Sequence, residues 1–201
     1  MIFVLLLFAL SGFGLVLQDF VPSVDSAYHA RILVVPVIFF ASALSVPYPV
    51  MLLFAFVTGF MWDALNHTPA FFPDIAAAAA QVGAPPPAEG GTFGITIFFY
   101  ALLGSLLHGI RPLFRTGRWE LPLLMTTVSL ILLLSLEYAS IGFRRGNFSF
   151  PPEVWNHILA TALLSSVLVP LVFLFIYRLA KLTGYRIRFD NPYYRRRLPP
   201  L

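Results

Sequence analysis

Two carboxylic acids, Asp63 and Glu137, lie within otherwise apolar stretches of the sequence. A charge at the centre of a membrane-spanning segment costs about 2.5–3.5 kcal/mol or more, so such acids face protein or water and are candidates for chemistry or binding. Arg31, Arg144 and Arg145 are expected at the same depth. The alternative is an ion pair or a protonated acid that fixes helix packing, and we favour it because buried pairs often set helix register.

Three histidines, His29, His67 and His157, are expected at helix ends on the same side of the membrane. Asp63 and His67 are four residues apart and share one face if the helix persists. With Glu137 they would offer nitrogen and oxygen ligands to a metal ion. No HExxH motif accompanies them, and a proline closely follows His67. We therefore predict no metal ion and no cofactor.

Other reactive constellations are missing from the sequence. There is no cysteine, which excludes disulfides, thiolate metal sites and a cysteine nucleophile. No Ser, His and Asp arrangement matches a hydrolase motif, and there is no phosphate-binding loop. The basic residues are not interleaved with aromatic residues along a polar surface, so nucleic acid is not an expected partner. The sequence therefore does not predict an enzyme.

The composition identifies the environment in which these residues must be positioned. Of 201 residues, 59% are hydrophobic and only 11% are charged, and the mean hydropathy is +0.84. Soluble domains carry nearer 25% charged residues, so a water-exposed surface is excluded, as is disorder. The apolar residues form solid blocks rather than alternating with polar ones, as the strands of a membrane barrel would require. The predicted class is an all-α, polytopic membrane protein.

Six transmembrane helices are expected within one domain, residues 1–181. Their approximate bounds are 1–17, 32–46, 50–65, 92–110, 121–143 and 154–177. The first run lacks a basic start and a cleavage site, so it is expected to be a retained helix. Prolines at 47 and 49 predict a tight turn between the second and third helices. Residues 66–91 form an outer loop rich in proline and alanine, and residues 182–201 form a basic cytoplasmic tail.

The basic residues predict the orientation. Six crossings place both termini on one side, with ten basic residues: Arg111, Arg115, Arg118, Arg178, Lys181, Arg186, Arg188, Arg195, Arg196 and Arg197. The other side has three: Arg31, Arg144 and Arg145. Because Lys and Arg are retained on the cytoplasmic side, both termini should be cytoplasmic. The tail is expected to attract anionic lipid, with a protein docking site as the alternative.

Small residues spaced four apart predict close helix contacts. The pairs are Gly90 and Gly94, Ala101 and Ser105, Thr161 and Ser165, and Ala162 and Ser166. We expect them to pack within one bundle, with a partner's helix as the alternative.

The order of these features resembles MreD, the bacterial rod shape-determining membrane protein. The third helix ends in Gly-x-x-x-Asp, from Gly59 to Asp63, and Thr92-Phe93-Gly94 opens the fourth. Glu137 and Tyr138 form the mid-helix acid and tyrosine pair, and the last helix contains a proline followed by an apolar run and a basic end, from Pro170 to Arg178. The resemblance covers most of residues 32–181. The outer loop is longer than in the family pattern, and Ser165 stands where an asparagine is expected.

The resemblance implies a noncatalytic scaffold of the cell-elongation machinery that synthesises peptidoglycan, in the bacterial inner (cytoplasmic) membrane. It implies MreC as a partner, and association with the RodA glycosyltransferase, a penicillin-binding transpeptidase and the MreB filament. It also implies a fold similar to the substrate-binding subunits of energy-coupling-factor transporters. Residues expected to bind partners or pack helices are Gly59, Asp63, Gly94, Glu137 and Pro170.

Two other functions stay open. A substrate-binding subunit of a small-molecule transporter would use an outer pocket lined by Asp63, Glu137 and the histidines. Such subunits carry small residues four apart on the first helix, whereas Ala9, Ser11, Gly12 and Gly14 have no such spacing. A membrane enzyme with metal bound to the acids and histidines is the third hypothesis.

Overall fold

A computed structural model describes residues 2–24, 28, 30–66, 93–110, 120–145 and 151–185 of the chain. The predicted outer loop beyond Asn66 and the tail from residue 186 lie outside the described residues.

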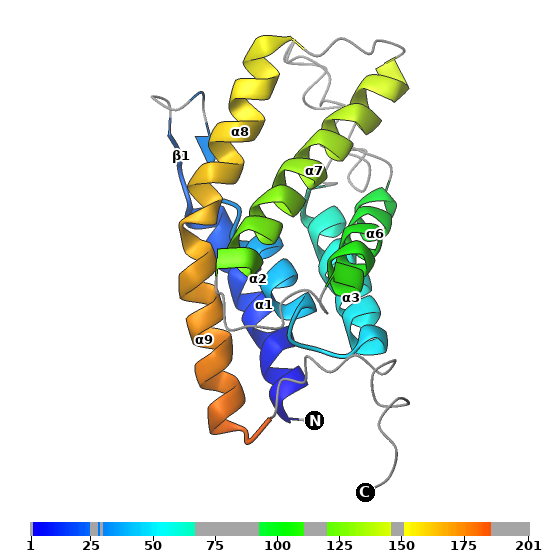
Figure 1. The fold of residues 1–201 in the computed structure, drawn as a ribbon. Helices are drawn as coiled ribbons and strands as arrows, with labels where there is room; N and C mark the ends of the chain where they lie inside the picture. Colours follow the sequence, from blue (N-terminus) through cyan, green and yellow to red (C-terminus); the bar gives the residue numbers. More distant parts are fainter. Residues whose placement is uncertain are drawn as a thin grey trace, which may run out of the picture.

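The described chain is an assembly of helices with one small hairpin (Figure 1). In order, the elements are α1 (Ile2–Phe20), β1 (Ser23–Val24), β2 (Ala30–Arg31), α2 (Val34–Ala43), α3 (Tyr48–Asn66), α6 (Ile95–Ile110), α7 (Glu120–Arg145), α8 (Pro152–Ser166) and α9 (Leu168–Leu182). Successive helices run up and down the bundle, and α9 continues the direction of α8 (Figure 1). The predicted helical class is confirmed, and each predicted helix has a counterpart.

Four described stretches are long and apolar enough to cross a membrane: Ile2–Phe20, Tyr48–Leu65, Leu121–Ser140 and Pro152–Leu182. The other two helices are shorter, with 10 residues in α2 and 16 in α6. At about 1.5 Å a residue they rise only ~15 and ~24 Å, against a hydrocarbon core about 30 Å thick. The fold is therefore compatible with a multi-pass membrane protein, while six full crossings stay a prediction.

The second helix is shorter than the predicted range 32–46. It starts at Val34 because Leu33 is extended, with φ −96° and ψ 92°. It ends at Ala43, where Ser45 and Val46 both donate their N–H groups to the carbonyl of Ser42. The predicted tight turn before α3 is confirmed. Prolines 47 and 49 are tolerated there because helix starts leave N–H groups without intrahelical partners.

The predicted last helix, 154–177, is longer and consists of α8 and α9 with a turn at Val167. Pro170 lies three residues after the turn and has no N–H group to donate to the carbonyl of Ser166, which explains the interruption. Its side chain is exposed. Helix α9 ends beyond the predicted residue 177, just before Gly184, whose φ of +63° belongs to the left-handed region that ends helices.

Helix α2 lies at the centre of the bundle. Nine of its ten residues are buried, and it contacts α1, α3, α6, α7, α8 and α9. A helix that is apolar on every side requires such a position. Phe39 stacks on Phe54 of α3 at 5.7 Å and meets the edge of Tyr100 of α6 at 4.7 Å, measured between ring centroids. The core of the fold therefore forms around α2.

The hairpin of β1 and β2 was not predicted. Ser23 pairs with Arg31 and Val24 with Ala30, in antiparallel register. The hairpin lies beside α8, where the carbonyl of Tyr28 is 2.9 Å from Nδ1 of His157.

The beginning of α1 and the end of α9 lie together, because the rings of Phe3 and Tyr185 stack at 4.3 Å. We call this the proximal end of the bundle. The opposite end, at Arg145 and Pro152, is the distal end, and α7 and α8 extend further toward it than α2, α3 and α6 (Figure 1). The described part of the chain thus has its first and last helices joined at one end.

Candidate functional site

Helices α3 and α6 touch at Gly59. A Cβ atom placed on Gly59 would lie 2.7 Å from the Cα atom and 2.9 Å from the backbone nitrogen of Ile97. Both atoms belong to the backbone of α6, so a side chain cannot be accommodated by a rotamer change. Small residues permit such close approach between helices in a membrane. Gly59 therefore sets the distance between α3 and α6.

Asp63 lies one helical turn beyond Gly59, on the same face of α3. Its side chain is buried, and its Oδ2 atom accepts a hydrogen bond of 2.7 Å from the N–H group of Gly94. Gly94 immediately precedes α6 and has a φ of +96°, which favours glycine. A carboxylate at this point satisfies a free N–H group and interacts favourably with the positive end of the helix dipole. The structure thus brings together the predicted residues Gly59, Asp63 and Gly94.

Arg31 does not pair with either acid in the described contacts. Its Nε donates to the carbonyl of Val21 at 2.9 Å, and its Nη2 donates to the carbonyl of Gln18. Gln18 belongs to the last turn of α1 and Val21 directly follows the helix, and cationic groups are favourable at this end of a helix. The other two arginines expected near the acids, at 144 and 145, have side chains outside the described set. Arg31 therefore joins the hairpin to α1.

The start of α2 is held by Gln18 of α1. Gln18 is buried, its Oε1 accepts the N–H of Val34 at 2.6 Å, and its Nε2 donates to the carbonyl of Ile32 at 2.8 Å. No residue of α2 itself provides this cap. Gln18 was not predicted as a functional residue, and it lies one residue past the predicted end of the first helix. An amide directly after an apolar run was the available signal.

Ser165 of α8 holds the same helix start from the other side. Its hydroxyl is fully buried, accepts the N–H of Leu33 at 2.9 Å, and donates to the carbonyl of Thr161 at 2.6 Å. The sequence marked Ser165 only as a departure from the family pattern and as a packing residue. Both short helices, α2 and α6, thus have their first N–H groups satisfied by side chains of longer neighbours.

Glu137 and Tyr100 form the remaining polar feature. Tyr100 is fully buried, and its hydroxyl has no hydrogen-bond partner among the described residues. Asp63 and Glu137 both lie within electrostatic range of that hydroxyl. Glu137 is half-buried and follows Leu130 and Leu133 along the face of α7 that points into the bundle. The structure thus places both predicted acids near one buried phenol.

The remaining predicted sites are not gathered with these. Pro170 lies on α9 with an exposed side chain, and His157 contacts the hairpin. Within the described ranges, no group of three or more His, Cys, Asp and Glu side chains could hold a metal ion. His29 and His67 lie outside those ranges. The printed contacts of Asp63, Gln18 and Ser165 join helices to one another.

No protein-family model, curated protein or solved structure matches this chain.

Proposed function

We propose that this chain is a noncatalytic scaffold of the bacterial cell-elongation machinery, related to MreD and binding MreC. One observation supports this most directly. Asp63, Gln18 and Ser165 each bind the backbone at the start of a neighbouring helix, rather than lining a reaction centre. Polar groups used in this way fix the positions of the helices, and the outer surface of the bundle then has a defined shape. RodA, a penicillin-binding transpeptidase and MreB are further proposed associates.

The residues that carry the resemblance support the same proposal. Gly59, Asp63 and Gly94 come from two segments of the sequence, yet they form one contact between α3 and α6. This contact gives a physical reason for the spacing of Gly-x-x-x-Asp, because the glycine permits the approach and the acid caps the helix. Glu137 and Pro170 are kept in the proposal as packing or partner residues.

The proposed location is the inner membrane, with both termini in the cytoplasm. In support, Arg178 and Lys181 are exposed at the proximal end, where α1 begins. Basic residues are retained on the cytoplasmic side, and they attract anionic lipid. The proposed lipid contact begins at these two residues and continues into the basic tail.

The α3–α6 pair offers an outer surface that depends on the Asp63 cap. Phe56, Phe60 and Phe98 are 45–62% exposed on this pair, and Phe56 and Phe60 are stacked. If the cap is lost, the start of α6 is free to shift relative to α3, and this aromatic surface changes shape. For this reason we propose that the affinity for MreC depends on the Asp63 cap.

The test is co-purification with MreC after detergent extraction. Asp63→Leu removes the cap and should abolish co-purification, whereas Asp63→Asn keeps an acceptor oxygen for Gly94 and should retain it. Asp19→Asn, at an exposed acid on α1, is the matched control and should behave as wild type. Thermal melting of each variant separates unfolding from loss of the interface. Intact co-purification by a folded Asp63→Leu variant would remove Asp63 from the proposal.

A substrate-binding subunit of a transporter is the second candidate. The observation in its favour is the buried Tyr100 hydroxyl without a described partner, close to Glu137 and Asp63. A ligand with polar groups would satisfy these side chains. A thermal-shift screen with vitamins and metal ions distinguishes the candidates, since a scaffold predicts no stabilisation and a binding subunit predicts stabilisation by one compound.

A further inference from the structure

Helix α1 gives the position of the membrane along the bundle. It has 19 residues and rises about 28 Å, close to the hydrocarbon core of about 30 Å. Helix α3 also has 19 residues and runs beside it, with the hydroxyl oxygens of Ser11 and Thr58 3.3 Å apart. Apolar side chains are exposed along the whole of α1, at Ile2, Leu5, Phe13, Val16 and Phe20. The distal membrane boundary therefore lies at the level of Phe20.

This boundary also suits the charged residues near it. Asp63 lies three residues before Asn66, the last residue of α3. The guanidinium group of Arg31 binds the carbonyl of Gln18, in the last turn of α1. Both charged groups thus lie at the interface rather than at the centre of the hydrocarbon, where a charge costs about 2.5–3.5 kcal/mol or more.

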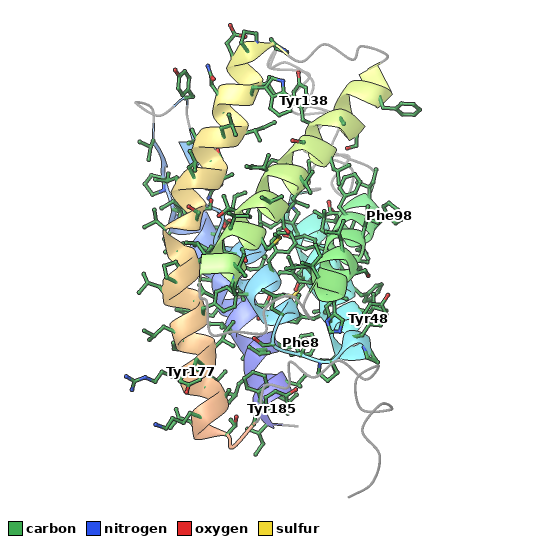
Figure 2. The ribbon with its side chains drawn as sticks, viewed as in Figure 1. Phe8, Tyr48, Phe98, Tyr138, Tyr177 and Tyr185 are labelled. Carbon is green, nitrogen blue, oxygen red and sulfur yellow. The ribbon has the colours of Figure 1, made fainter. Side chains whose placement is uncertain are left out.

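Helix α9 spans the same depth as α1, because the two helices are joined at two levels. At the proximal end the ring of Tyr185 stacks on Phe3 (Figure 2). Near the distal boundary, Gln18 of α1 and Ser165 of α8 accept neighbouring N–H groups at the start of α2. Ser165 and Gln18 therefore lie at one level, about 3 Å inside the end of α1.

Residues 152–164 of α8, which we name the arm, project beyond this boundary. The stretch Pro152–Leu182 has 31 residues and rises about 46 Å, roughly 16 Å more than the thickness of the hydrocarbon core. The distal part of α7 accompanies the arm, and Figure 2 shows Tyr138 on the side of α7 that faces α8. Strand β2 also packs against α8. The inner side of the arm is thus covered by α7 and the hairpin.

The outer side of the arm is apolar. Trp155, Leu159 and Leu163 are 42%, 41% and 60% exposed, and their spacing of four places them on one face of α8. Leu163 lies at the boundary, whereas Leu159 and Trp155 lie about 6 and 12 Å beyond it. Hydrocarbon cannot cover a face at that distance. An apolar stripe outside the membrane therefore indicates an interaction surface.

The same face continues into the membrane along the exposed side chains of Val167, Leu171 and Leu174. Its occupant must therefore extend across the boundary, as α8 and α9 do. A second copy in the same orientation meets this requirement, because a two-fold axis along the membrane normal places each arm beside its counterpart. No Asp, Glu, Lys or Arg lies between Glu153 and Arg178 in the sequence. Two identical faces can thus meet without the repulsion of like charges.

We propose that two copies of this chain pair through the outer face of α8 and α9, with their arms in contact beyond the membrane. One interface covers both apolar stripes at once. The interface belongs to other helices than the aromatic surface of α3 and α6, and it does not depend on the scaffold role. Failure of one proposal therefore leaves the other intact.

Cysteine cross-linking tests the pairing directly, because the chain contains no native cysteine. Leu159→Cys places a thiol on the arm, beside its own counterpart across the two-fold axis. Asp19→Cys is the matched control, since Asp19 is exposed on α1 near the same boundary. The full-length variants are reconstituted in lipid vesicles at several ratios of protein to lipid, oxidised with copper phenanthroline, and compared by the fraction of covalent dimer.

A disulfide requires two Cα atoms within about 7 Å, so Leu159→Cys should give at least about fivefold more covalent dimer than Asp19→Cys. This yield should persist when added lipid dilutes the protein. A yield no higher than that of the control, or one that falls with dilution as random collisions do, would reject the pairing. A monomer whose Leu159→Cys thiol is protected from a membrane-impermeant maleimide would reject it as well, because another segment of the chain would then cover the stripe.

Discussion

The carboxylate of Asp63 accepts a 2.7 Å hydrogen bond from the backbone N–H of Gly94, although 31 residues separate them in the sequence. This bond joins the distal end of α3 to the start of α6. It lies one turn from Gly59, where the two backbones are in contact. The pair of helices is therefore fixed in both distance and register by two side-chain positions.

Removing the Asp63 cap should lower stability. Asp63→Ala leaves the N–H of Gly94 without a partner, and we expect the free energy of unfolding to fall by about 1–3 kcal/mol. Asp63→Asn keeps an oxygen acceptor and should lose less than half of this. Unfolding in mixed detergent micelles measures both values. Equal losses for the two variants would show that charge, rather than the hydrogen bond, is responsible.

Enlarging Gly59 should separate α3 from α6. Gly59→Leu places side-chain atoms against the backbone of Ile97, and overpacking of this kind lowers stability by about 1–3 kcal/mol. Gly12→Ala is the control, because a Cβ at Gly12 meets no atom within 4 Å. The control variant should unfold at the same fraction of denaturing detergent in the micelles as the wild-type protein, or at a higher one. A Gly59→Leu protein as stable as this control would contradict the close contact.

Replacing each of two adjacent serines in α8 by alanine should change the stability of the protein by different amounts. Ser165→Ala removes the acceptor for Leu33 and should lower the unfolding free energy by about 1–2 kcal/mol. Ser166 donates only to the carbonyl of Leu163 in its own helix, so Ser166→Ala should change stability by less than about 0.5 kcal/mol. The same unfolding assay compares them. The assignment of the cap fails if Ser166→Ala is the more harmful substitution.

Reporter fusions should place the two ends of the bundle on opposite sides of the membrane. A fluorescent protein that folds only in the cytoplasm should fluoresce when fused after Leu201. A phosphatase that is active only outside should be active when inserted in residues 66–91. The reason is the excess of arginine and lysine expected on the side of the termini. Activity of both reporters on one side would contradict the predicted orientation.

The sequence predicted the helices because their signal is local. Blocks of apolar residues with few charges specify membrane helices whatever their neighbours are. The prolines at 47 and 49 identified the turn before α3, and Asp63 was recognised because an acid in an apolar block needs a partner. Its contact with Gly94 was not predicted, since a bond between distant segments depends on how the helices pack.

The features that were missed depend on tertiary structure. Helix α2 is short because Gln18 and Ser165 cap its start within the bundle, so the apolar residue Leu33 before it is extended. The hairpin contains only two residues in each strand, too few for an alternating pattern to be visible. Contacts of this kind between distant or very short segments produce no recognisable pattern in the sequence.

The cap on Leu33 has a consequence for biogenesis, because its acceptor, Ser165, lies 132 residues later in the chain. A ribosome has completed α2 long before it synthesises α8. During that interval the beginning of the second helix has only half of its final support, from Gln18. We therefore expect the start of α2 to be completed only when α8 is inserted, and chains truncated before α8 to be degraded by membrane proteases faster than the full chain.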